Sequence, residues 1–168
     1  LGIYLIYGVA FEAHQQNSFM VMAADGQLSH LLLRDFGDIR IDRKALHAQG
    51  LDIQLHDPKM TLYDESGFVR DKLLHTTFMC HLGELALLCA RHWNVPESLL
   101  WNELAAQVSQ CFDTLRERVE PQRWETERQA LLELDWPAKS FMRMRLQDSH
   151  ADIVGRLSNP LSTIANGR

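Results

Sequence analysis

The sequence predicts an α+β fold that is mainly helical, with a small antiparallel β-hairpin or sheet near the N-terminus. Two observations carry this prediction. Apolar residues recur with helical spacing from Gly67 to about residue 135, whereas short β-prone runs follow one another between Ser18 and Asp42. The chain has 168 residues, of which 46% are hydrophobic, so we expect one domain over residues 1–168 with a sizeable core.

The first element is expected to be a buried helix over about residues 1–17. Its apolar side chains recur at i, i+3, i+4 and i+7, and the opposite face is apolar too. The last part of this segment is polar: Glu12, His14, Gln15, Gln16 and Asn17. On a helix, Glu12 and Gln16 stack on one face while His14 and Asn17 share another. Burying such groups without partners costs about 1 to 3 kcal/mol each, so either the fold or a ligand must satisfy them.

A β-hairpin is expected next, because SFMVMA and LSHLLLRDF are joined by a turn that contains Asp25-Gly26. A third strand is expected over residues 38–42, where polar and apolar residues alternate. Residues 43–67 contain Gly50, Pro58 and Gly67 among mixed polar residues, which indicates a long loop with one or two helical turns.

Three helices are expected after Gly67. The first is a long apolar segment that ends at Asn94, ahead of Pro96, and the second opens with Pro96 in its first turn. The third covers roughly residues 122–134. The cysteines form no CxxC pair, and those at positions 80 and 89 are expected to pack as small apolar groups in a buried helix.

The bulk composition excludes several classes of protein. The net charge is −5 and the 17 Lys and Arg residues are scattered, so we expect no nucleic-acid partner. The apolar run at residues 1–11 is shorter than the roughly 20 residues of a membrane span, and it lacks the features of a signal peptide. We therefore expect a soluble, cytoplasmic protein without a membrane partner. The start at Leu1, directly in an apolar run, suggests a piece of a longer chain.

A second polar group, Arg34-Asp35-Phe36-Gly37-Asp38, stands at the end of the hairpin's second strand. A carboxylate such as that of Asp35 could hold a hard cation such as Mg²⁺. The alternative is that Arg34 and Asp35 form a surface ion pair before a turn.

A third group contains three cations, Lys139, Arg143 and Arg145, among apolar residues. As a strand, this run places all three with Phe141 on one face; as a helix, it aligns only Lys139 with Arg143. Such cations suit a carboxylate or phosphate ligand, although a solvated basic face is the alternative. The sequence contains no glycine-rich phosphate loop, no HExxH and no GxSxG.

Taken together, EAHQQN, LLLRDFGDIR and PAKSFMRMRL resemble the C-terminal half of the siderophore synthetases that work independently of non-ribosomal peptide synthetases, the aerobactin-synthetase-like family. The resemblance implies the palm of a larger hand-shaped enzyme, active as a homodimer in its full-length form. It also implies ATP and Mg²⁺ as cofactors. Such enzymes adenylate a carboxyl group of citrate or of a citrate or dicarboxylate derivative, and then join it to an amine or hydroxyl of a polyamine or N-hydroxylated diamine. A fragment of this kind is expected to be inactive alone.

The resemblance also implies roles for individual residues. Glu12 and Asp35, with Gln16 or Asn17, would face the Mg²⁺ and phosphates, and Asn17 is assigned to the metal with them. His14, in contact with the carboxylate substrate, and Lys139 would be catalytic. Binding of the substrate carboxylate or of nucleotide phosphate would fall to four further residues: Gln16, Arg34, Arg143 and Arg145.

Two other functions remain open from the sequence. Ferric siderophore reductases share some similarity with this half of the synthetases, but they hold an iron–sulfur cluster on closely spaced C-terminal cysteines, and here no cysteine follows Cys111. The other possibility is a non-catalytic helical interaction module, in which residues 12–17 are satisfied polar groups of the core.

Overall fold

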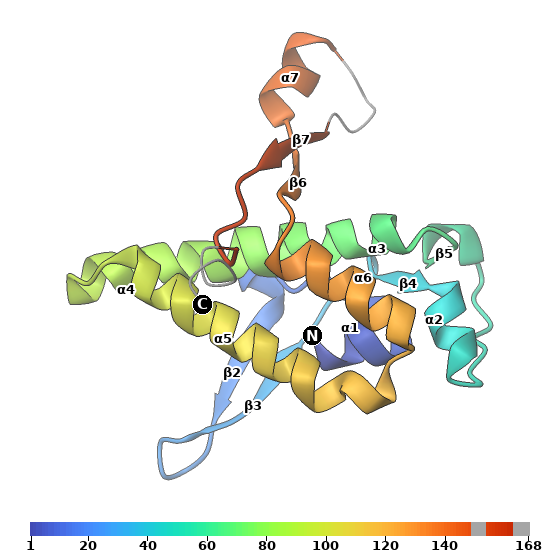
Figure 1. Ribbon diagram of the computed structural model, residues 1–168, viewed down its shortest axis with the longest axis horizontal. Coiled ribbons are helices and arrows are strands. Elements are labelled where there is room, and N and C mark those ends of the chain that lie inside the picture. Colours follow the sequence, from blue (N-terminus) through green and yellow to red (C-terminus); the bar gives the residue numbers. More distant parts are fainter. Residues whose placement is uncertain (149–153, 163–168) are drawn as a thin grey trace. The chain divides into compact units, whose positions relative to one another are not determined.

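Figure 1 shows the computed structural model of the chain, which describes residues 1–148 and 154–162. The described residues are mainly helical and form small sheets, so the predicted α+β class is confirmed. It divides into two compact units, residues 7–85 and residues 1–6 with 86–168, and each unit is described by itself.

The unit of residues 7–85 is built on a small sheet with the strand order β1-β4-β5. Its strands are β1 (Val9–Ala10), β4 (Arg40–Asp42) and β5 (Leu62–Tyr63). β1 pairs antiparallel with β4, and β4 pairs parallel with β5. A buried cluster lies on this sheet: Ile41, Leu46 and Leu62, with Tyr7, Val9, Ile39 and Leu55 packed against it.

The predicted N-terminal helix is much shorter than expected, because α1 (Gly2–Tyr7) ends before Gly8. Gly8 has a φ of +72°, which ends the helix. A Cβ atom at Gly8 would lie only 2.7 Å from Asp42 Cβ and 2.8 Å from Ala45 Cβ. The chain then enters β1, where pairing with β4 overrides the helical spacing of the apolar residues. The predicted stacking of Glu12 on Gln16 is therefore wrong.

The predicted hairpin is confirmed and consists of β2 (Ser18–Met22) and β3 (Leu28–Leu33), joined through Asp25 and Gly26. Gly26 has a φ of +79°, as a tight turn favours. Several large apolar side chains of the hairpin are exposed: Phe19, Met20, Met22, Leu28, Leu31 and Leu32. The predicted third strand does form, as β4, but it pairs with β1 and β5 instead of extending the hairpin.

Residues 43–67 contain the expected helical turns, namely α2 (Arg43–Ala48) and the 3₁₀ turn η2 (Pro58–Met60). Asp42 is 1% exposed and begins α2, because its Oδ1 accepts hydrogen bonds from the backbone nitrogens of Lys44 and Ala45. Its Oδ2 accepts a hydrogen bond of 2.6 Å from the Ser66 hydroxyl. One buried carboxylate thus connects α2 to the start of α3 (Ser66–Lys72).

A continuous helical stretch follows: α3, the π-helix η3 (Leu73–Gly83) and α4 (Glu84–Trp93). Among the described residues, Ser66–Trp93 is the one helix long and apolar enough to cross a membrane, by length and composition only. A core helix satisfies the same criteria, so this is weak evidence for a membrane span. The expected burial of both cysteines is wrong for Cys80, which is exposed; Cys89 is partly buried.

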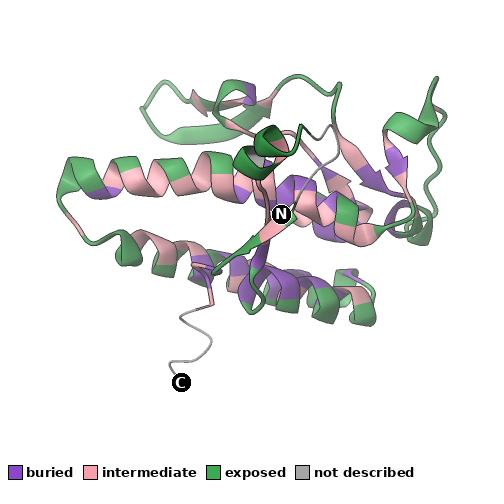
Figure 2. Ribbon diagram, turned by 90° about the horizontal axis from the view of Figure 1, so that it is seen from above, coloured by how far each residue is buried: buried purple, intermediate pink, exposed green. Residues whose placement is uncertain are grey.

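The second unit contains the remaining predicted helices, α5 (Glu97–Leu115) and α6 (Pro121–Leu132). α4 ends before Asn94 and α5 begins after Pro96, as expected. Figure 2 shows buried and exposed residues alternating along the helices, as burial of one helix face requires. The core of this unit includes Phe112, whose ring meets that of Trp124 edge to face at 5.9 Å.

Side chains of α6 also hold α1, whose first five residues belong to this unit. The Arg123 guanidinium donates hydrogen bonds to the carbonyl oxygens of Tyr4 and Leu5. The Tyr4 hydroxyl donates a hydrogen bond of 2.6 Å to the carboxylate of Glu127, which is 1% exposed. These contacts satisfy polar groups at the end of a short helix.

The C-terminal part of this unit is a hairpin of β6 (Trp136–Lys139) and β7 (Val154–Leu157), with α7 (Phe141–Leu146) in the connection. Asn159 follows the hairpin and is 3% exposed. Its side-chain nitrogen donates to the carbonyl oxygens of Leu131 and Leu134 at the end of α6.

Glu120 gives the fold a pH dependence that can be tested. Its carboxylate accepts hydrogen bonds from the backbone nitrogens of Gln122 and Arg123, and these bonds lower the pKa of Glu120. Because the pKa is lower in the folded state, the stabilisation is present above the unfolded pKa and is lost as pH falls through the folded pKa. Glu120→Gln should therefore lower the thermal midpoint at neutral pH, and the difference should shrink in acid.

Thermal unfolding measured between neutral pH and about pH 3 would check this prediction. The control is Glu117→Gln, which changes an exposed carboxylate that accepts no backbone hydrogen bond within the described residues. A difference between wild type and Glu120→Gln that does not vary with pH would contradict it.

Candidate active site

The polar segment after β1 does not form a helix, and this determines where its side chains lie. The chain is irregular from Phe11 to His14 and then forms the 3₁₀ turn η1 (Gln15–Asn17). Gln15 and Gln16 are exposed on this turn, whereas Asn17 is 3% exposed. Gln15 and Gln16 therefore face outward, whereas Asn17 faces inward, although the sequence pattern had placed them in one group.

Asn17 holds the segment that precedes it. Its side-chain nitrogen donates to the backbone oxygen of Glu12 at 3.2 Å and lies 3.4 Å from Nε2 of His14. Its backbone nitrogen donates to the backbone oxygen of His14 at 3.0 Å. Asn17 thus fixes the half-buried imidazole of His14. Both of these side-chain contacts use Nδ2 of Asn17, so its Oδ1 is left, among the described residues, for another donor or a cation.

The structure places the second motif beside the first. The backbone nitrogen of Arg34 donates to the backbone oxygen of Asn17 at 3.0 Å, which continues the pairing of the hairpin. The rings of Phe11 and Phe36 meet edge to face at 5.8 Å. Two polar groups that are about twenty positions apart in sequence therefore form one cluster.

Asp35 occupies a bend in this loop. It has a φ of +63°, which few residues other than Gly, Asn and Asp adopt, and its carboxylate accepts a hydrogen bond of 3.3 Å from the backbone nitrogen of Gly37. The Asp35 side chain remains exposed. Arg34 is also exposed, and its guanidinium lies over the ring of Phe19 at 5.2 Å. The Arg34 side chain is therefore positioned by this aromatic ring and not by the alternative ion pair with Asp35.

The central residue of the cluster is Lys72, which sequence analysis missed. Its ammonium group lies 3.4 Å from Glu12 Oε1 and 2.5 Å from Asp38 Oδ2. The Lys72 side chain is 7% exposed, against 26% for Glu12 and 59% for Asp38. The sequence did contain a signal for this contact, namely a lysine within the helical segment FVRDKLLHTTF. A lysine that is buried in such a helix needs a carboxylate partner.

The oxygen atoms of this cluster suit Mg²⁺. Glu12 and Asp35 supply carboxylates and Asn17 an amide oxygen, and magnesium is usually bound through one or two carboxylates together with water and phosphate oxygens. Within residues 1–148 and 154–162, no group of three or more His, Cys, Asp and Glu side chains could by itself hold a metal ion.

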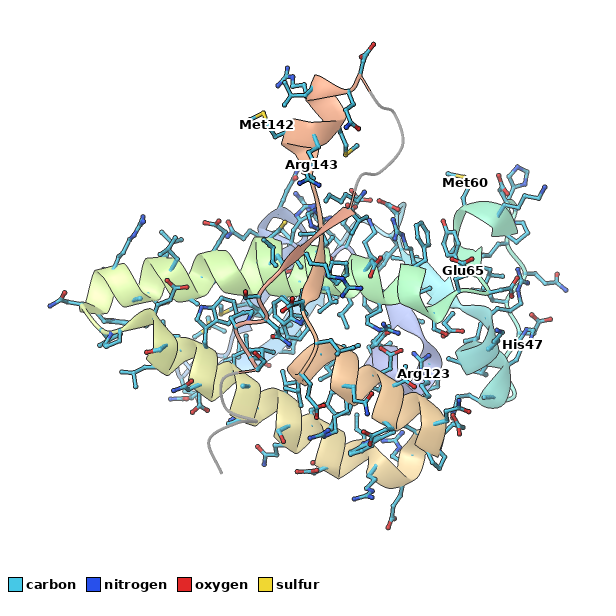
Figure 3. All side chains as sticks on the ribbon, turned by 45° about the horizontal axis from the view of Figure 1, so that its top comes forward. His47, Met60, Glu65, Arg123, Met142 and Arg143 are labelled. Atoms are coloured by element: carbon cyan, nitrogen blue, oxygen red, sulfur yellow. The ribbon has the colours of Figure 1, made fainter. Side chains whose placement is uncertain are left out.

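The three cations of the third motif lie in the other unit. Lys139 is the last residue of β6, whereas Arg143 and Arg145 belong to α7. The prediction that one strand places all three on one face is wrong, and so is an uninterrupted helix through Lys139, because the chain changes from strand to helix at Ser140. On α7, Arg143 and Arg145 are two residues apart and so point in different directions; both are exposed. Figure 3 labels Arg143 on this helix.

Comparison with known proteins assigns the family. The model of a family described as ferric iron reductase FhuF-like transporter matches residues 1–153. The chain belongs to this family, and it matches the C-terminal part of siderophore synthetases that work independently of non-ribosomal peptide synthetases.

Three relatives illustrate the assignment. The chain is 39% identical over 170 residues to y4xN of Sinorhizobium fredii, in a match that covers 97% of the chain and 27% of the relative. It is 32% identical over 112 residues to D-ornithine–citrate ligase of Staphylococcus aureus, covering 65% of the chain and 17% of that enzyme. It is 29% identical over 154 residues to the NRPS-independent siderophore synthetase-like protein ankE of Aspergillus thermomutatus, covering 89% and 23%. The chain thus spans about a quarter or less of their length.

Solved structures share the fold. The petrobactin biosynthesis protein AsbB of Bacillus anthracis matches with a TM-score of 0.74 and 21% identity, over 97% of the chain and 28% of AsbB. The aerobactin synthetase IucC of Klebsiella pneumoniae matches with a TM-score of 0.73 and 23% identity, over 98% of the chain and 28% of IucC.

Proposed function

We propose that the chain is the palm-like part of an ATP-dependent siderophore synthetase, in which its two units work as one domain. The enzyme would be cytoplasmic and, at full length, a homodimer. One observation supports this proposal above all: the Glu12–Asn17 and Arg34–Asp38 motifs come together around the buried cation Lys72. The named citrate ligase among the relatives supports citrate, or a citrate or dicarboxylate derivative, as the substrate.

The proposed reaction has two steps. A carboxylate oxygen of the substrate attacks the α-phosphorus of ATP, so that an acyl-adenylate forms and pyrophosphate leaves. The amine or hydroxyl of a polyamine or N-hydroxylated diamine then attacks the acyl carbon and displaces AMP, while its proton passes to a base. The first step brings a carboxylate against the anionic α-phosphate, and Mg²⁺ bound with ATP would offset their negative charge.

We assign the residues as follows. Glu12, Asn17 and Asp35 hold Mg²⁺ through oxygen atoms. His14, which Asn17 holds in place, is the base that receives the proton of the nucleophile. Lys139 is the catalytic cation of the other unit. The carboxylate and phosphate groups are bound by Gln16, Arg34, Arg143 and Arg145.

A substrate panel on the full polypeptide tests the proposal. Citrate, citryl monoamides and 2-oxoglutarate are each combined with several polyamines and an N-hydroxylated diamine, and AMP release is measured with ATP and Mg²⁺. We expect AMP release that requires one carboxylate and rises with one class of nucleophile. No ATP-dependent AMP release from any combination would contradict the proposal.

The family description favours reduction of a ferric siderophore as a second candidate function. That function predicts visible absorbance from an iron–sulfur cluster in the purified full polypeptide, and oxidation of a reduced electron donor by a ferric siderophore. A colourless protein that releases AMP would exclude it.

A further inference from the structure

We propose that Lys72 is a positioning residue of this site, which holds Glu12 and Asp38, and with them the two motifs, in one arrangement. The catalytic consequence of this inference depends on the proposed synthetase function. The structural consequence does not, because it concerns contacts within residues 7–85 alone.

The charges explain why Lys72 determines this arrangement. A lysine that is 7% exposed is costly to bury unless carboxylates compensate its charge, and here two do so. Glu12 and Asp38 come from different motifs, and each lies within 3.4 Å of the same ammonium group. Without this cation, both carboxylates would remain beside an apolar helix, and they would repel each other.

The π-helical turns of η3 continue this contact along the chain. The Thr76 hydroxyl donates to the backbone oxygen of Phe11 at 3.1 Å, and Nδ1 of His81 lies 2.9 Å from the backbone oxygen of Ala13. Lys72, Thr76 and His81 therefore contact three consecutive residues, Phe11 to Ala13, from one face of the helical stretch. The segment that carries Glu12 is held on both sides of that residue.

The π-helical geometry favours this alignment. In an α-helix, nine residues advance by about 900°, so His81 would lie opposite Lys72. A helix with i→i+5 hydrogen bonds turns by roughly 80° per residue, so nine residues make about two full turns and bring His81 back to the face of Lys72. The π-helix spans Leu73–Gly83, which covers the whole interval between these two residues. π-helices are rare, and their usual form, a single turn within an α-helix, is frequently found at functional sites.

Lys72 is more suited to positioning than to contact with substrate, because its side chain is almost completely buried. Glu12 keeps 26% of its side chain exposed, so it can face Lys72 and a ligand together. Loss of a residue that orients a metal ligand typically lowers metal affinity or activity by about 10- to 100-fold. We expect an effect of this size on activity, with a higher Mg²⁺ concentration required for the half-maximal rate.

The experiment uses Lys72→Met in the full polypeptide, which removes the charge and keeps the apolar stem. The matched control is Lys44→Met, which changes an exposed lysine of the same unit. Backbone hydrogen exchange without ligands is measured first, because it requires no activity. In Lys72→Met, amides of residues 11–17 and 34–38 should exchange at least about fivefold faster, whereas Lys44→Met should match wild type.

AMP release and its Mg²⁺ dependence are measured second. Lys72→Met should be about 10- to 100-fold slower than wild type and should need more Mg²⁺, whereas Lys44→Met should not. If Lys72→Met does not fold, Lys72→Gln is measured in the same way. Thr76→Val gives an independent variant, in which exchange should rise for residues 11–14 because the bond to Phe11 is lost.

Unchanged exchange in both motifs on replacing Lys72 would overturn the inference. Faster exchange with full activity and unchanged Mg²⁺ dependence would overturn its catalytic part. If wild type releases no AMP from any substrate, the proposed function fails, and the exchange data still decide whether Lys72 positions the two motifs.

Discussion

Glu12→Gln is expected to lower ATP-dependent AMP release by about 100-fold or more in the full polypeptide. The substitution keeps the size of the side chain and removes the charge that both Lys72 and a magnesium ion would face. Glutamine still offers an oxygen, but a neutral amide binds a hard cation more weakly than a carboxylate. The rate and the Mg²⁺ concentration for half-maximal rate, measured together, show whether metal binding is what is lost.

Glu65→Gln is the matched control for this substitution. Glu65 is exposed in the same unit and precedes α3 without a hydrogen bond from its side chain to the helix. It should retain wild-type activity. Equal activity of wild type and Glu12→Gln, with normal Mg²⁺ dependence, would remove Glu12 from the proposed metal site.

Gly8→Ala should destabilise the fold by about 2 to 4 kcal/mol. Two effects add at this position. The φ of +72° is unfavourable for alanine, and the new Cβ would lie within 2.8 Å of the Cβ atoms of Asp42 and Ala45. Both neighbours belong to the start of α2, so no flexible side-chain end can move away. Chemical denaturation followed by tryptophan fluorescence measures the change.

Gly26→Ala separates the two effects, because Gly26 has a similar φ of +79° but a Cβ there would meet nothing within 4 Å. It should cost only the conformational strain, about 1 to 2 kcal/mol. If the two variants lost equal stability, the close approach of Gly8 to Asp42 and Ala45 would contribute nothing.

Local patterns in the sequence predicted those elements whose structure is decided locally. The hairpin follows from β-prone runs around Asp25-Gly26, and the limits of α4 and α5 follow from Asn94 and Pro96. These features depend on neighbouring residues alone. They were therefore accessible without knowledge of the tertiary structure.

The end of α1 could not be predicted in this way. The spacing of apolar residues continues past Tyr7 as on a helix, but Val9 and Ala10 instead pair with residues that lie about thirty positions further along the chain. A strand pair of this kind is decided by tertiary contacts, which override the helical pattern. For the same reason, the third strand was predicted to exist but not with its correct partners.

The sequence motifs identified polar residues of the candidate site, but not the contacts that join these residues to the helical stretch. Glu12, Asn17 and Asp35 were identified through the motifs, and the structure adds the cation of Lys72, which joins Glu12 and Asp38 to the helical stretch. The position of His81 on the face of Lys72 depends on a π-helix, which the apolar pattern of the segment does not reveal. The roles assigned to Lys139, Arg143 and Arg145 stay predictions.

The exposed hairpin has a practical consequence for work with this polypeptide. Apolar side chains cover both faces of β2 and β3, with Met20 and Leu31 each 63% exposed. A two-stranded hairpin of this composition also presents unpaired strand edges, which are templates for adding strands from other molecules. Residues 18–33 are therefore the first place to look when a preparation aggregates, and the place where charged substitutions would most improve solubility.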